Sequence, residues 1–207
     1  VSGHFLKLLK MIHDTHPRMR FIFTGSMFGL MRTLLQPSVS SPMYGRKPAK
    51  IELKPFTEEL SMGFLRKGFE ELGVGIKEDE LAEAISAFNG YVGWLTYYGN
   101  FRCIRKVSRE MALEEVANEG MKVMKGELDS FLEGRDRKAY TIVLRSTALG
   151  ARWSEIKRAL EKEFGEFNSK RLSDILNVLK ASMLVEERGN VYIVPDPIVR
   201  RTVIEMI

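Results

Sequence analysis

The spacing of hydrophobic and polar positions changes several times along the 207-residue chain. Apolar residues recur at helical spacing from Phe5 to Ile12, which predicts an N-terminal helix. Residues 21–23 are a short apolar run bounded by small polar residues, which is typical of a buried strand in a parallel sheet. A second helix is expected over residues 27–36, with Ser26 as its N-cap. This part of the chain therefore predicts an α/β arrangement.

The middle of the chain is predominantly helical in pattern. Thr57 followed by two glutamates is typical of a capped helix with an acidic first turn. Leu60, Phe64 and Phe69 are expected to form the apolar stripe of that helix. A second helix is predicted over residues 77–88, an apolar segment over 91–98, and one or two helices over 107–133.

The C-terminal third has the pattern of a winged helix. Three helices are predicted over residues 138–149, 153–164 and 169–182. Two short β-rich runs then flank Arg188, which predicts a hairpin, and a last helix covers residues 198–206. In this fold the third helix is the candidate recognition helix.

The net charge, the cysteine content and the length of the apolar runs limit the classes of function that the chain can have. The net charge is +5, and residues 135–207 hold 14 Lys and Arg against 10 Asp and Glu, whereas residues 1–134 hold 18 against 17. This excess permits nucleic-acid binding without requiring it. A single cysteine, Cys103, excludes an internal disulfide and favours a reducing, cytoplasmic setting. No apolar run is long enough for a membrane span, so no membrane partner is expected.

Five segments, in this order and spacing, resemble the archaeal P-loop ATPases of the AAA/STAND group. They are FIFTGSMFGLM (21–31), SPMYGR (41–46), IELKPFTEELSMGFLRKGFEELG (51–73), GYVGWLTYYG (90–99) and VYIVPDPIVRR (191–201). The resemblance implies a mainly α fold with an α/β remnant. Residues 1–55 would be the C-terminal part of a P-loop ATPase core, residues 56–134 a helical lid with connecting helices, and residues 135–207 a winged-helix domain.

The resemblance also implies roles for individual residues. Thr24, Gly25 and Ser26 would form the polar end of the sensor 1 strand, where a hydroxyl can bind the attacking water or the terminal phosphate. Arg46 would supply positive charge to the phosphates. From the pattern alone, the two hydroxyls are better explained as a strand end and a helix cap, and Arg46 is better explained as a solvated surface charge.

The lid motif of the family corresponds to residues 90–94. Gly90, Gly93 and Trp94 match it, but Val92 stands where the family has proline, which puts the nucleotide contact of the lid in doubt. By pattern alone, Trp94 is better explained as lid core than as a surface for stacking a base.

Two other family motifs are missing from the sequence. It contains no GxxxxGK[ST] and no apolar strand ending in paired acidic residues, so it lacks a phosphate cradle and a magnesium carboxylate. Both motifs are expected upstream of Val1, in which case the chain is a C-terminal fragment; otherwise it is a degenerate relative. ATP and Mg²⁺ are accordingly expected only in the complete protein, and the chain alone is expected to be inactive.

Two other classes of function stay open. Lys170 and Arg171 at the start of the third helix, with Arg188 at the wing tip, are candidate DNA contacts of a transcriptional regulator. Glu186 and Glu187 beside the wing tip argue against tight phosphate binding. The winged helix would otherwise bind a protein partner as a scaffold, and an oligomer is possible.

Overall fold

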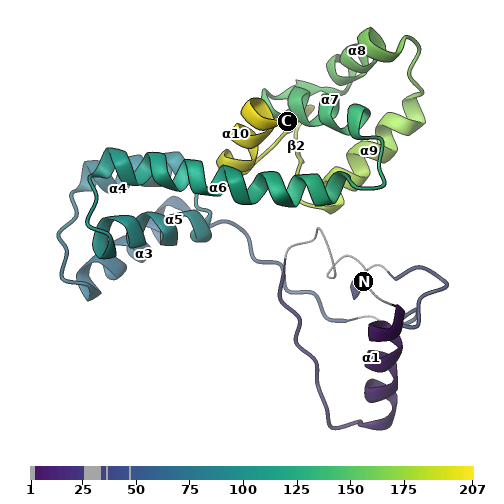
Figure 1. The fold of residues 1–207 in the computed structure, drawn as a ribbon, viewed down its shortest axis with the longest axis horizontal. Helices are drawn as coiled ribbons and strands as arrows, with labels where there is room; N and C mark the ends of the chain where they lie inside the picture. The colour runs from purple at the N-terminus through teal and green to yellow at the C-terminus, as the bar shows by residue number, and fades with distance from the viewer. Residues whose placement is uncertain (1–2, 26–33, 36, 47) are drawn as a thin grey trace. The chain divides into compact units, whose positions relative to one another are not determined.

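The computed structural model describes residues 3–25, 34–35, 37–46 and 48–207 (Figure 1). The chain divides into a smaller unit, Val1–Glu52 with Ala181–Met183, and a larger unit, Leu53–Lys180 with Leu184–Ile207. Each unit is described by itself.

The smaller unit is organised around helix α1 (Gly3–Thr15), which confirms the predicted N-terminal helix. Leu6 and Leu9 of this helix are buried with Leu34, and Phe21 and Phe23 pack against this cluster. The apolar residues at helical spacing thus form a small core of their own.

The strand predicted at residues 21–23 is wrong. These residues have no regular secondary structure, and Ile22 between the two phenylalanines is 90% exposed. A strand needs a neighbouring strand to pair its backbone N–H and C=O groups, and the described residues of this unit include none. The helix predicted over residues 27–36 lies outside the described residues except for Leu34 and Leu35.

The first part of the larger unit is a helical lid. It consists of α3 (Glu58–Glu71), α4 (Glu78–Phe88), α5 (Val92–Gly99), a π-helical turn η1 (Asn100–Ile104) and the long helix α6 (Arg109–Leu132). Helix α3 packs against α4 and α5, and α4 and α5 pack against α6 (Figure 1).

An N-cap determines where α3 begins, and a buried apolar face determines which side of α3 packs against the lid. The Thr57 hydroxyl accepts a hydrogen bond from Leu60 N at 3.3 Å, as expected for an N-cap. The buried face contains Leu65 and Phe69, whereas Leu60 is 58% exposed and Phe64 is 37% exposed. The expected apolar stripe is therefore correct only at Phe69, because the face that packs is displaced by one residue.

The second part of the larger unit is the predicted winged helix. Its elements are α7 (Arg137–Ala148), β1 (Ala151–Arg152), α8 (Trp153–Phe164), α9 (Ser169–Ala181), β2 (Glu186–Arg188), β3 (Val191–Ile193) and α10 (Pro197–Met206). Within the described residues, the strands form an antiparallel sheet in the order β1-β3-β2, with Glu187 opposite Tyr192. The predicted hairpin is confirmed, and Gly189 supplies the positive φ of +61° in its turn.

Helix α10 joins the winged helix to the lid. It packs against both α6 and α7, and α6 in turn packs against α4 and α5 (Figure 1). Buried Val199 and Val203 lie on the packed face of α10. The lid and the winged helix are therefore one compact unit with a shared long helix. In the part of the chain that is described, no helix is long and apolar enough to cross a membrane.

Candidate functional site

The segment that corresponds to the lid motif lies between α4 and the first turn of α5. We call residues 89–94 the lid loop. Asn89 caps α4 in the left-handed conformation (φ +47°) and Gly90 follows with φ +75°, so two consecutive residues turn the chain. Helix α5 then starts at Val92.

Gly90 is required where it stands. Phe56 N donates a hydrogen bond to Gly90 O at 2.8 Å, which fixes the segment that enters α3 against the lid loop. A Cβ added to Gly90 would lie 2.0 Å from Phe56 O, a backbone atom that cannot move out of the way cheaply. Gly93, by contrast, has room for a side chain, because a Cβ there would meet nothing within 4 Å.

Trp94 lies where α5, α6 and α10 meet. Its Nε1 donates to the carboxylate of Asp196, at 3.2 Å from Oδ1 and 3.0 Å from Oδ2. Its ring covers Gly120 of α6, where an added Cβ would lie 3.2 Å from Trp94 Cζ3 and 2.9 Å from Ile198 Cγ2. The absence of a side chain at Gly120 allows the indole and α10 to approach α6 together.

Asp196 performs two tasks at this junction. As N-cap of α10, its Oδ1 accepts from Ile198 N at 2.8 Å and Val199 N at 3.2 Å, and it also accepts from Trp94. Burial raises the pKa of the Asp196 carboxyl above its ordinary value, although the bonds from Trp94 and the helix amides act in the opposite direction. A second, longer bond runs beside it, from Asn89 Nδ2 to Pro195 O at 3.4 Å.

Sequence reasoning singled out Trp94 but missed Asp196. The Pro195-Asp196-Pro197 pattern contained a usable signal, because Asp before Pro at the first helical position is typical of a helix N-terminus. No sequence signal links Asp196 to an indole 102 positions away.

The lid also contains a buried polar network that supports the π-helical turn. Glu80 accepts from Tyr98 Oη at 2.8 Å and from Arg102 Nε at 2.6 Å, while Arg102 Nη1 donates to Val107 O at 2.8 Å. Burial raises the pKa of Glu80, but the bonds from Arg102 and Tyr98 outweigh it and leave that pKa below its usual value. These contacts fix the end of α5 and serve the lid structurally.

The candidate sensing residues are placed as follows. Thr24 and Gly25 are exposed, and Ser26 lies outside the described residues. Arg46 donates from Nη2 to both carboxylate oxygens of Asp14, each at 2.7 Å. That pairing, with a further bond from His13, lowers the pKa of Asp14. The predicted phosphate contact is therefore held by an acidic partner within its own unit.

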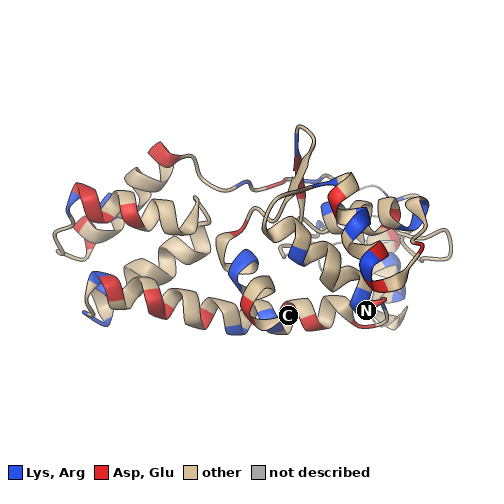
Figure 2. Cartoon of the chain, turned by 90° about the horizontal axis from the view of Figure 1, so that it is seen from above, with Lys and Arg blue, Asp and Glu red and all other residues tan. Residues whose placement is uncertain are grey.

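The candidate DNA contacts are largely neutralised. Arg171 pairs with Asp136 and lies over the Phe167 ring, and Arg188 pairs with Glu186. Lys170 is exposed and has no ion pair among the described residues. Residues 166–190, which span α9 and the wing, hold four basic and four acidic residues. Along the cartoon of the chain as a whole, basic and acidic residues are interspersed (Figure 2).

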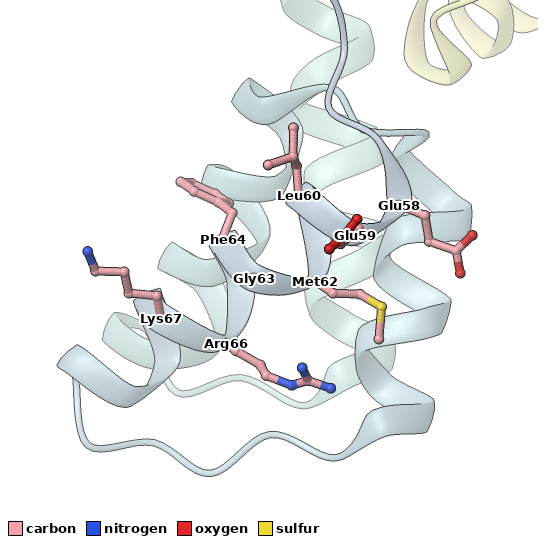
Figure 3. Close-up of a pocket in the computed structure, with 8 residues that line it drawn as sticks. All are labelled: Glu58, Glu59, Leu60, Met62, Gly63, Phe64, Arg66 and Lys67. Atoms are coloured by element: carbon pink, nitrogen blue, oxygen red, sulfur yellow. The ribbon is translucent and has the colours of Figure 1, made fainter.

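A shallow hollow on α3 does not form a ligand site. All eight side chains or backbone positions that line it come from this one helix (Figure 3). Leu60 and Phe64 are exposed on it, and Arg66 is paired with Glu78. One helix cannot enclose a ligand. In the described ranges there is also no group of three or more His, Cys, Asp or Glu side chains placed to hold a metal ion.

Comparisons with known proteins agree with this architecture. Residues 134–194 match the family model described as the MCM protein C-terminal winged helix-turn-helix domain. Among solved structures, the chain is similar to a Walker-type ATPase of Pyrococcus abyssi, with 31% sequence identity and a TM-score of 0.79 over 97% of this chain. The chain spans 57% of the length of that ATPase. A comparison with curated proteins gave no match. These findings support an ATPase-like C-terminal portion that contains a winged helix.

Proposed function

We propose that this chain is the C-terminal portion of an AAA/STAND-type ATPase. In the complete protein, its N-terminal residues would sense the nucleotide state, and that state would set the arrangement of the lid and the winged helix. The similarity to a Walker-type ATPase over nearly the whole chain supports this function. So does the order of the parts, because the lid follows the core segment and the winged helix follows the lid.

The observation that carries the proposal is the contact between Trp94 and Asp196. By resemblance, the lid loop is the segment next to the nucleotide, and in this chain the same loop binds the N-terminus of α10. A change at the lid loop would therefore reach the winged helix through one directly bonded pair of side chains.

In the complete protein, Thr24 and Ser26 would sense the terminal phosphate. Arg46 would add positive charge after exchanging Asp14 for a phosphate oxygen, since its Nη2 already donates to anionic oxygens in the Asp14 carboxylate. Gly90 and Gly93 would shape the lid loop, and Trp94 would connect it to the winged helix.

The described residues do not fit Mg²⁺ and ATP on their own. They contain no glycine-rich loop ending in Lys-Ser or Lys-Thr and no cluster of metal ligands. We therefore assign the phosphate cradle and the metal carboxylate to the rest of the complete protein. We place that protein in the cytoplasm, because the single cysteine of this chain, Cys103, is free, as is typical of a reducing compartment.

The coding sequence upstream of Val1 tests the proposal. We expect it to encode GxxxxGK[ST] after an apolar strand, and a second apolar strand that ends in acidic residues. An upstream sequence with neither feature would contradict the function as a part of an active ATPase.

The winged helix has a second candidate function, the binding of a partner through α9 and the wing. The neutral charge of residues 166–190 favours a protein partner over duplex DNA, because DNA affinity depends on unpaired cations at phosphates. A fluorescence titration with random duplex DNA at low salt should therefore give a flat curve. Salt-sensitive binding that is lost in Lys170→Ala and Arg171→Ala would instead support a DNA-binding regulator.

A further inference from the structure

The lid loop is held at both of its ends, by different parts of the chain. At the first end, Phe56 N bonds to Gly90 O, and Phe56 belongs to residues 53–57, which we call the linker because they lead into α3. At the other end, Trp94 bonds to Asp196 at the start of α10. Only four positions along the chain separate Gly90 from Trp94.

The contact with the linker leaves little freedom. The left-handed conformations of Asn89 and Gly90 are one reason, since they fix the path of the backbone through the turn. The second reason is the close contact of the two backbones, since an ideal Cβ on Gly90 would lie only 2.0 Å from Phe56 O. A displacement of Phe56 must therefore move or break the lid loop.

The contact with α10 is equally specific. The Asp196 carboxylate, which receives the indole N–H, also caps the first turn of α10 through Ile198 N and Val199 N. The indole ring fills the space above Gly120, so it cannot shift without leaving α6. A displacement of Trp94 must therefore disturb the cap of α10 or remove a hydrogen bond from the half-buried Asp196 carboxylate, which is costly.

We propose that the lid loop is a coupling joint, in which the Phe56–Gly90 bond and the Trp94–Asp196 bond open and close together, so that a pull on the linker loosens the winged helix from the lid. The joint is a property of this chain, and it holds whether or not the complete protein hydrolyses ATP. By reciprocity, loosening the winged helix must also loosen the linker.

Hydrogen exchange measured by NMR on the 207-residue chain tests the joint from both sides. Phe56→Pro removes the N–H that bonds to Gly90 O and places a ring carbon where that hydrogen was, so the linker must move away from Gly90 O; it also removes the Phe56 ring from its contact with Phe64. We expect this variant to raise the exchange rate of the Trp94 indole N–H at least tenfold. Asp196→Ala acts from the other side, and we expect it to raise the exchange rate of the Phe56 amide at least fivefold.

Matched controls separate coupling from unfolding. The Leu81 amide, which donates to Lys77 O in α4, should keep its exchange rate in both variants, because α4 carries neither contact. The indole of Trp153 serves as the second internal reference. Gly93→Ala changes the same loop at an open position and should accelerate exchange at neither reporter.

The proposal fails if either variant accelerates exchange only at the contact that it removes, and not at the other contact. An unchanged Trp94 indole in Phe56→Pro, or an unchanged Phe56 amide in Asp196→Ala, would show two independent contacts. Equal acceleration at Leu81 would show general loss of the lid, and in that case the milder variant Trp94→Phe, which removes the indole N–H and keeps an aromatic ring, must still accelerate exchange of the Phe56 amide for the joint to stand.

Discussion

At the scale of single residues, Asp196 is the side chain on which the junction depends most. Asp196→Ala removes the N-cap of α10, at a typical cost of about 1 kcal/mol, and leaves the Trp94 indole N–H without its acceptor, at about 1–3 kcal/mol. We expect the free energy of unfolding, measured in urea, to fall by about 2–4 kcal/mol. A loss below about 0.5 kcal/mol would mean that the contact contributes little.

Asp196→Asn is the matched variant, and its effect should depend on pH. Because burial raises the pKa of Asp196 in the folded chain, the folded state binds more protons than the unfolded state between pH 3.8 and that raised pKa. The stabilisation that comes from this raised pKa is therefore fully present below pH 3.8 and is lost as the pH rises through the folded pKa.

Asparagine keeps an acceptor for Trp94 and does not titrate. We expect Asp196→Asn to be at least as stable as the original chain at pH 7, and to lose this advantage toward pH 4. Urea unfolding at several pH values measures the difference, and the opposite trend with pH would contradict the assigned direction of the pKa.

At the scale of elements, the two glycines of the lid motif should respond oppositely to alanine. Gly90→Ala introduces a Cβ at 2.0 Å from a backbone oxygen and at φ +75°, so we expect a loss of more than about 2 kcal/mol. Gly93→Ala, inside α5 with open space around it, should stabilise the chain by up to about 1 kcal/mol. Thermal unfolding of both variants provides the comparison, and similar melting temperatures would refute the distinction.

The elements also show what the sequence could predict. Helices with clear periodicity and a cap, such as α3 after Thr57, were predictable because their signals are local. The winged helix was predictable for the same reason, including the turn at Gly189. The strand at residues 21–23 was not, because a strand exists only with a partner, and hydrophobicity alone does not show whether one is present.

The candidate site was less predictable than the fold. The resemblance to a family pointed to Gly90 and Trp94, and it predicts a nucleotide beside them. Their contacts in the structure are with Phe56 and Asp196, which lie 34 and 102 positions away in the sequence. Contacts at such separations depend on how the helices pack, and a single sequence does not contain that information.

At the scale of the whole molecule, the lid and winged helix form one unit, and the segments that would hold ATP and Mg²⁺ are not among the residues of this chain. The similar ATPase is longer, since the chain spans 57% of it. The central proposal is thus that these residues would regulate a nucleotide site that other residues of the complete protein would provide.

ATP turnover with Mg²⁺ tests this claim most directly, measured on the 207-residue chain and on the protein extended through the coding sequence upstream of Val1. We predict no turnover by the chain alone and measurable turnover by the extended protein, which should change when Asp196→Ala loosens the winged helix from the lid. Turnover by the isolated chain, or an extended protein with no turnover at all, would contradict the account.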